Sequence, residues 1–175
     1  LDLDQAWQQA LGAMVPSGSL RPVQAEALDK SGLLSSRKNL VVSAPTNSGK
    51  SLIGDLLLYQ TVRNGKRAVL IEPLRALAQE KASDLRETIG RIPAEFFDHT
   101  PKVILSTGDQ RLELEAFTDP PPNSGEIIVT TPERLDSILR NPETKDWVST
   151  IGALVVDEAH LIGSTNRGPT LELVI

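Results

Sequence analysis

Residues 44–51 of this chain read Ala-Pro-Thr-Asn-Ser-Gly-Lys-Ser and lie between a short apolar run at 40–42 and a long apolar stretch at 51–62. The short run is typical of a buried strand, and the longer stretch has the length of a helix. A tight turn between a strand and a helix brings backbone N–H groups together at the helix N-terminus, where the helix dipole favours negative charge. Residues 44–51 therefore predict a phosphate-binding loop in an α/β fold.

Three side chains of this loop suit phosphate chemistry. Gly49 allows close approach of the backbone, Lys50 supplies a point charge for the β- and γ-phosphates, and Ser51 offers a hydroxyl to magnesium. The pattern G-x-x-x-x-G-K-[ST] is not complete, because Ala44 occupies the position of the first glycine. The alternative is a Gly-Lys-Ser turn that arises by chance and binds nothing.

Further apolar runs continue the strand–helix alternation along the chain. They do not alternate with polar residues, so they predict strands that are buried on both faces of a parallel sheet. Thr131 followed by Pro132 predicts a helix start, with threonine as N-cap and proline at the first helical position. The other predicted strands are 68–71, 103–105, 127–129 and 153–156; predicted helices lie within 3–14, after Pro22, within 74–89 and from Pro132 to Leu139.

Composition excludes several classes of site. The chain has 175 residues, of which 39% are hydrophobic and 23% charged, and this is a globular balance that fits one domain spanning 1–175. The absence of cysteine excludes disulfides and thiolate chemistry, and two histidines argue against a multi-histidine metal site. The net charge of 18 − 23 = −5 excludes a strongly basic nucleic-acid clamp.

The ends of the chain and its hydropathy bear on location. No apolar run reaches the roughly 18–20 residues that span a bilayer, so no membrane partner is expected. The acidic start lacks the basic region of a signal peptide, and this predicts an intracellular protein, cytoplasmic or nuclear/nucleoid. The missing initiator methionine and the apolar C-terminal stretch predict a fragment of a longer protein.

A second chemical motif follows the apolar run at 153–156. It reads Asp157-Glu158-Ala159-His160. Two adjacent acids at the end of a buried strand are costly to desolvate unless something pairs with them, and a magnesium ion would do so. Asp157 is then the metal-side carboxylate, and Glu158 the group that orients and deprotonates an attacking water. The alternative is a solvated turn at a strand end.

These motifs occur among others in a recognisable order. The segment 20–28, LRPVQAEAL, resembles the adenine-recognising glutamine motif of superfamily two helicases, and 73–81, PLRALAQEK, resembles their motif Ia. The segments 106–109 and 130–136 resemble two further nucleic-acid-contacting motifs. HLIG at 160–163 and RGPTLE at 167–172 resemble the superkiller-type branch of the DEAD/DEAH-box helicases. The resemblance extends from about residue 20 to 172.

The resemblance implies a fold and an activity. The fold is a RecA-like P-loop domain with a parallel sheet flanked by helices on both faces, the first of two such motor domains. The activity is an ATP-dependent helicase that uses ATP and Mg²⁺ and holds DNA or RNA through the phosphate backbone, with a second RecA-like domain as partner. Two alternatives stay open: an ATP-driven translocase that remodels nucleoprotein complexes, and a nucleotide-binding switch that does not hydrolyse ATP.

The resemblance also implies roles for matching residues. Gln24 would bind adenine, although a surface glutamine is its plainer interpretation; Arg75 could likewise be a solvated helix residue and Thr131 only a cap. His160 would couple the nucleotide site to the second motor domain. The triphosphate would be lined by Thr46, Asn47, Ser48, Gly49, Lys50 and Ser51; the catalytic set would be Lys50, Asp157, Glu158 and His160; the metal would be held by Ser51 and Asp157; the nucleic-acid set would be Arg75, Thr107, Gly108, Thr131 and Arg134.

Three departures from the family pattern carry expectations of their own. Asn47 replaces a usual glycine, so we expect it to have positive φ and a side chain that points away from the phosphates, into solvent or onto a neighbouring backbone group. Ser51 replaces threonine and keeps the hydroxyl. The proline-rich stretch at 118–125 lengthens a connection and is predicted to be an exposed loop. The sequence assigns no role to His99.

Overall fold

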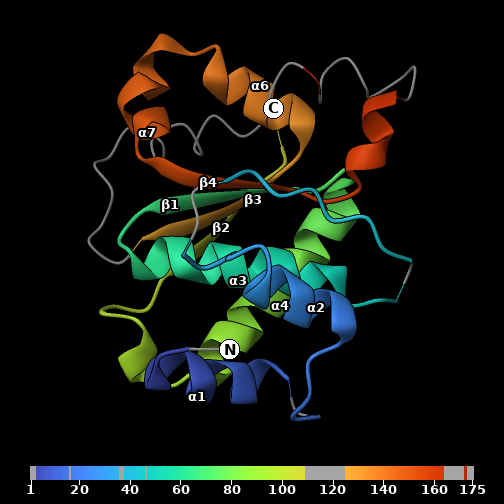
Figure 1. The fold of residues 1–175 in the computed structure, drawn as a ribbon. Helices are drawn as coiled ribbons and strands as arrows, with labels where there is room; N and C mark the ends of the chain where they lie inside the picture. Colours follow the sequence, from blue (N-terminus) through green and yellow to red (C-terminus); the bar gives the residue numbers. More distant parts are fainter. Residues whose placement is uncertain are drawn as a thin grey trace.

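The computed structural model describes residues 3–15, 17–35, 38–45, 47–108, 125–163 and 172. Its centre is one parallel sheet with the strand order β2-β3-β1-β4. The helices cover both faces of the sheet (Figure 1), as the sequence predicts. The strands are β1 (Arg67–Ile71), β2 (Lys102–Ser106), β3 (Glu126–Thr130) and β4 (Ile151–Val156); α3 (Lys50–Arg63) and α4 (Arg75–Arg91) lie on one face, and α6 (Pro132–Leu139) and α7 (Lys145–Ser149) on the other.

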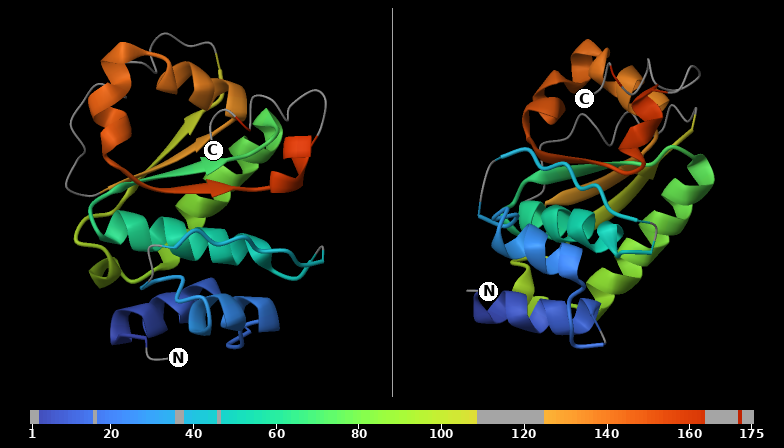
Figure 2. Two further views of the ribbon diagram at one scale, coloured as in Figure 1. Left: turned by 45° about the horizontal axis from the view of Figure 1, so that its top comes forward. Right: turned by 45° about the vertical axis from the view of Figure 1, so that its right-hand side comes forward.

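Two N-terminal helices form a further layer below α3 and α4 (Figure 2). They are α1 (Gln5–Met14) and α2 (Pro22–Asp29), and proline stands at the first position of α2. Short 3₁₀ turns complete the described elements: η1 (Ala94–Phe96), η2 (Pro142–Thr144) and η3 (Ala159–Gly163). No described helix has both the length and the apolar character that a membrane span requires.

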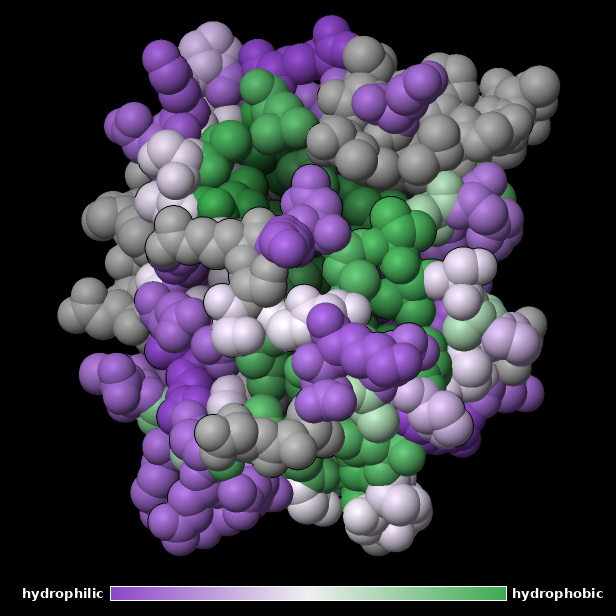
Figure 3. Space-filling view, viewed as in Figure 1, coloured by the Kyte–Doolittle hydropathy of each residue, from purple (hydrophilic) through white to green (hydrophobic). Residues whose placement is uncertain are grey.

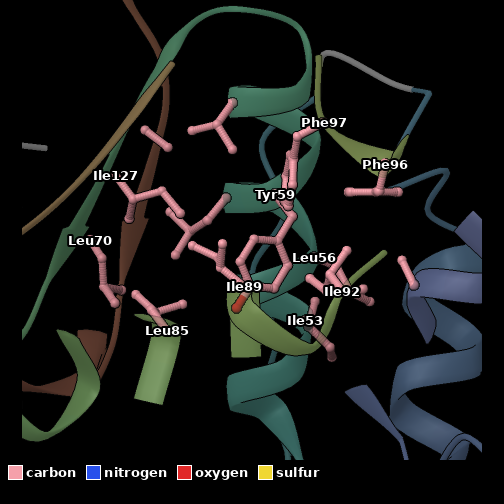
Figure 4. Close-up of a cluster of buried hydrophobic side chains, with 14 of the residues drawn as sticks. Ile53, Leu56, Tyr59, Leu70, Leu85, Ile89, Ile92, Phe96, Phe97 and Ile127 are labelled. Carbon is pink, nitrogen blue, oxygen red and sulfur yellow. The ribbon is translucent and has the colours of Figure 1, made fainter. Parts of the chain in front are cut away.

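The core between the sheet and α3 and α4 is mostly aliphatic, as the low aromatic content predicts. Ile53 and Leu56 of α3 belong to this core together with Leu85 and Ile89 of α4 (Figure 4). Three aromatic rings of this cluster meet edge to face: Phe96 and Phe97 are 4.7 Å apart, and Tyr59 and Phe97 are 6.3 Å apart, between ring centroids.

Burial separates the central strands from the outer ones. All residues of β1 and β3 are buried, whereas β2 and β4 are mostly half-buried. The prediction that every strand is buried on both faces is therefore correct for the central pair alone, since β2 and β4 form the edges of the described sheet.

The predicted strand at 40–42 is wrong. These residues have no strand conformation, Val41 is 91% exposed and Leu40 is 41% exposed, while Val42 packs against the core. With most of its apolar side chains in solvent, the segment gains little by joining the sheet. The described sheet thus has four strands rather than five, and apolar side chains reach the surface over β4 (Figure 3).

Candidate nucleotide site and nucleic-acid groove

The predicted phosphate loop leads directly into α3, which begins at Lys50. Gly49 precedes the helix with φ +86°, and a side chain there would collide with the Gln24 amide. Asn47 has φ +62° and is exposed, which confirms its predicted left-handed backbone. Two left-handed residues bend the chain so that it turns sharply into the N-terminus of a helix.

The side chains of the loop fit a phosphate group. The Lys50 ammonium donates to the Ala44 carbonyl oxygen across the loop at 2.8 Å, so its charge lies within the turn. The Ser48 hydroxyl is buried and has no hydrogen-bond partner in the described part of the chain. The first N–H groups of a helix have no partner inside that helix either. Thr46 lies outside the described residues.

Gln24 of α2 and Arg21, the N-cap of that helix, both donate hydrogen bonds to the backbone of this loop. Gln24 is buried; its Oε1 accepts from the Arg21 backbone N–H at 2.8 Å, and its Nε2 donates to the Gly49 carbonyl oxygen at 2.9 Å. One N–H of the amide remains for a ligand, so the predicted adenine contact stays a prediction. Sequence reasoning missed Arg21, whose guanidinium donates to the Asn47 carbonyl; its signal is a basic residue directly before the Pro22 helix start.

The acidic motif lies at the carboxyl end of β4. The Asp157 backbone N–H donates to the Ile71 carbonyl oxygen at 3.1 Å, and Asp157 Oδ1 accepts from the Glu158 backbone N–H at 2.8 Å. Glu158 has φ +53°, an unfavourable conformation for glutamate of the kind that gathers at functional sites. Its Oε2 lies 3.1 Å from His160 Nδ1, so the structure brings Asp157, Glu158 and His160 together as predicted.

A further carboxylate in this region was not predicted. Glu72 directly follows β1 and is only 4% exposed. Burial, reinforced by the nearby Asp157 carboxylate, raises the pKa of Glu72 to about 7. The available signal was an acid immediately after a continuous apolar strand, the same position that Asp157 holds after β4.

An ion pair connects the two helices beneath these acids. Lys81 Nζ of α4 lies 2.7 Å from Asp55 Oδ1 of α3, with both side chains largely buried. Burial raises the pKa of Asp55 in spite of this pair. Asp55 lies one helical turn beyond Ser51, so the ion pair fixes the start of α3 against α4.

The predicted nucleic-acid residues lie at the carboxyl ends of three strands. Arg75 begins α4 after β1, Thr107 and Gly108 follow β2, and Thr131 and Arg134 follow β3. A groove of about 500 Å³ contains two of these residues, and its lining is Pro73, Leu74, Arg75, Ala76, Thr131 and Glu133.

These residues differ in how they meet the groove. Arg75 is exposed there, whereas Thr131 is 5% exposed and caps α6 by position without a side-chain hydrogen bond. Arg134 Nε donates to the Ser106 hydroxyl at 3.1 Å, which joins α6 to the end of β2. The structure therefore places Arg75 and Thr131 in one groove. Arg134 is hydrogen-bonded to Ser106, the residue before Thr107.

Comparison with known proteins gives this arrangement its context. Residues 21–175 match the DEAD/DEAH box helicase family. The ATP-dependent DNA helicase Hel308 of Methanocella arvoryzae is 39% identical over all of this chain and 22% of its own length. The RQC trigger complex helicase SLH1 of Saccharomyces cerevisiae is 34% identical over 82% of this chain and 7% of its own length.

A solved structure agrees with the sequence matches. It is that of Mycobacterium smegmatis helicase Lhr bound to ssDNA and AMP-PNP; the TM-score is 0.74 and the identity 27%, over 95% of this chain and 22% of that one. The chain thus spans about a fifth or less of these relatives. The matches and the parallel sheet show a RecA-like fold, and the chain belongs to the superkiller-type branch of the DEAD/DEAH box helicase family.

Proposed function

We propose that residues 1–175 form the first RecA-like motor domain of an ATP-dependent nucleic-acid helicase. The observation that carries this proposal is the shared sheet edge: the phosphate loop at the start of α3, Asp157 and Glu158 after β4, and the groove with Arg75 all lie at the carboxyl ends of parallel strands, where α/β sheets bind ligands. A second RecA-like domain of the same protein would close over this edge.

The chain's own residues suggest how nucleotide would be held. The loop N–H groups and the Lys50 ammonium bind the triphosphate, while Gln24 offers its remaining N–H to the adenine. Ser51 and Asp157 would hold a magnesium ion, which neutralises charge on the phosphates when bound. The fit is supported by the Ser48 hydroxyl, which has no hydrogen-bond partner among the described residues, and by the buried Glu72 carboxylate beside Asp157.

Glu158 suits the role of the base. Its carboxylate is half-exposed, and its backbone is left-handed directly after the end of β4. From there it would accept a proton from the water that attacks the γ-phosphate. The contact with His160 holds the carboxylate in place, and His160 itself is exposed toward any second domain.

Single-stranded DNA is the proposed substrate of the groove. Hel308 is named a DNA helicase and Lhr is bound to ssDNA, and both relatives cover this chain almost completely. Arg75 and the Thr131 backbone would contact phosphates, which carry no sequence information. RNA is the other outcome of the test.

The test is magnesium-dependent ATP turnover by the full-length protein. We expect turnover to rise on addition of single-stranded DNA more than on addition of RNA of the same length. Glu158→Gln should keep nucleotide binding and lose turnover, while Arg75→Ala should keep basal turnover and lose part of the stimulation. Absence of ATP turnover under all conditions, with nucleotide still bound, would support the non-hydrolysing switch instead.

A further inference from the structure

Glu72 and Asp157 are side by side on one face of the sheet. β1 and β4 are parallel neighbours with Ile71 opposite Val156, and the hydrogen bond from the Asp157 N–H to the Ile71 carbonyl continues this pairing by one residue. Side chains alternate along a strand. Leu70 and Val155 pack into the core on the side of α3, so the residues two further on, Glu72 and Asp157, lie on that side as well.

The charges around Glu72 do not balance. Asp55, Asp157 and Glu158 face it with negative charge, and Lys81 is the positive group that reaches it. Lys81, however, lies 2.7 Å from Asp55 and neutralises that carboxylate. Within the described residues nothing donates a hydrogen bond to the Glu72 carboxylate, although it is only 4% exposed.

A buried carboxylate in this position calls for a cation or a set of donors. Among the described residues, no three acids or histidines are grouped as they would be around a directly bound metal ion. Magnesium in phosphate sites keeps several of its waters and takes one or two protein carboxylates. A group that accepts hydrogen bonds from the metal's ligands or bound waters orients those ligands without contacting the metal itself.

We propose that Glu72 is a positioning residue for the magnesium ion of the nucleotide complex, and that its carboxylate accepts hydrogen bonds from water bound to the ion that Asp157 holds. This inference rests on the proposed function. It assigns a role to a residue outside both the acidic motif at 157–160 and the phosphate loop. It also accounts for an acid beside Asp157, at a position where burial of an apolar side chain would cost less free energy.

The test measures the magnesium requirement of nucleotide binding in the full-length protein. A fluorescent ATP analogue is titrated at rising Mg²⁺ concentration, and Mn²⁺ binding is followed by electron paramagnetic resonance with a non-hydrolysable analogue present. Glu72→Gln should raise the metal concentration at half-effect about tenfold, the scale found for outer-shell partners. Its nucleotide affinity without metal should be equal or higher, because one negative charge near the triphosphate is gone.

Two further variants separate this role from a structural one. Glu72→Asp keeps the charge on a side chain that is shorter by one methylene. Its metal concentration at half-effect should lie between those of the wild type and Glu72→Gln. Glu95→Gln removes an exposed carboxylate in η1, far from the site, and should leave the midpoint unchanged. Unchanged midpoints in both Glu72 variants would overturn the proposal. A wild-type protein that binds nucleotide without any response to magnesium would instead count against the proposed function.

Discussion

The Lys50 ammonium is the loop's one positive charge, and the structure holds it inside the turn by a 2.8 Å bond to the Ala44 carbonyl. Phosphate oxygens would replace this neutral acceptor by charged ones. Lys50→Ala should therefore weaken ATP binding by about 2–3 kcal/mol, the scale of a charge-assisted contact. Isothermal titration of the full-length protein measures this.

Lys145→Ala is the matched control for Lys50→Ala. Lys145 is exposed at the start of α7, near the amino end of β4 and thus opposite the site. Its removal should leave ATP affinity as it is. Equal nucleotide affinity in Lys50→Ala and wild type would be inconsistent with a phosphate loop at 44–51.

Asn47 illustrates a residue whose backbone, rather than its side chain, matters. Its φ of +62° is accessible to Asn and Gly, while a β-branched residue resists it at a cost of about 1–2 kcal/mol or more. Asn47→Gly should keep nucleotide affinity within a few fold, and Asn47→Val should lose most of it, as measured by the same titration. A valine variant that binds ATP normally would mean that the loop does not need this conformation.

Glu72 gives the metal-free domain a pH-dependent stability. Its pKa is raised from 4.5 to about 7 by burial and by Asp157, so between these values the folded carboxyl keeps a proton that the unfolded chain releases. Stability due to this group is therefore present below pH 4.5 and falls as the pH rises through 7. Glu72→Gln should add up to about 3 kcal/mol at pH 8 and little at pH 4.

Urea unfolding of the domain at the two pH values measures this difference for Glu72→Gln, without magnesium. Exposed Glu95→Gln serves again as the control, because an exposed carboxyl has no burial to relieve. The same gain at both pH values would show that packing, and not the proton, accounts for the effect.

At the scale of elements, periodicity predicts the helices and the central strands well. α3 begins at the end of the phosphate loop and α6 begins at Pro132 as predicted, and α4 covers most of the stretch predicted at 74–89, because an early helical proline and 3.6-residue spacing are local signals. The strand predicted at 40–42 was wrong, since three consecutive apolar residues do not show whether the segment will pair with a neighbouring strand.

The sequence did not predict which residues far apart in the chain contact each other at the site. The Lys81–Asp55 ion pair joins residues 26 apart, and the brace from Gln24 to Gly49 joins residues 25 apart. Neither pairing has a local signature. Motif order singled out Asp157, whose role stays a prediction, but Glu72 belongs to no motif, and its burial follows from the packing of β1 between β3 and β4.

Trp7 is the largest buried side chain of helix α1. Trp7 is 3% exposed, its Nε1 donates to Gln60 Oε1 at 2.9 Å, and its ring meets Phe96 edge-on at 4.7 Å. Trp7→Ala should lower the free energy of unfolding by about 3–5 kcal/mol, the usual cost of removing a large buried aromatic group. Trp7→Phe keeps most of the volume and should cost less.

Thermal unfolding followed by circular dichroism measures both Trp7 variants. Gln8→Ala is a suitable control, since Gln8 lies next along α1 with an exposed side chain. A Trp7→Ala domain as stable as the control would show that α1 is dispensable for the core.

At the scale of the whole molecule, the proposed function requires a second domain at the site. The chain covers 22% of Hel308 from Methanocella arvoryzae, and the shared sheet edge with its groove faces outward. In the proposed motor a second RecA-like domain supplies the arginine finger, which is worth roughly 10³–10⁵ in rate where it operates.

Residues 1–175 alone should therefore bind nucleotide weakly and turn it over very slowly, whereas the full-length protein should hydrolyse ATP with stimulation by nucleic acid. Binding of single-stranded DNA by the domain should also be weak and should fall steeply with salt, because the net charge is −5 and contacts to phosphate release counterions. Parallel assays of ATP turnover, DNA binding and duplex unwinding on both proteins test this. Robust unwinding by the 175 residues would mean that one RecA-like domain suffices, and that the exposed sheet edge already contains the complete motor.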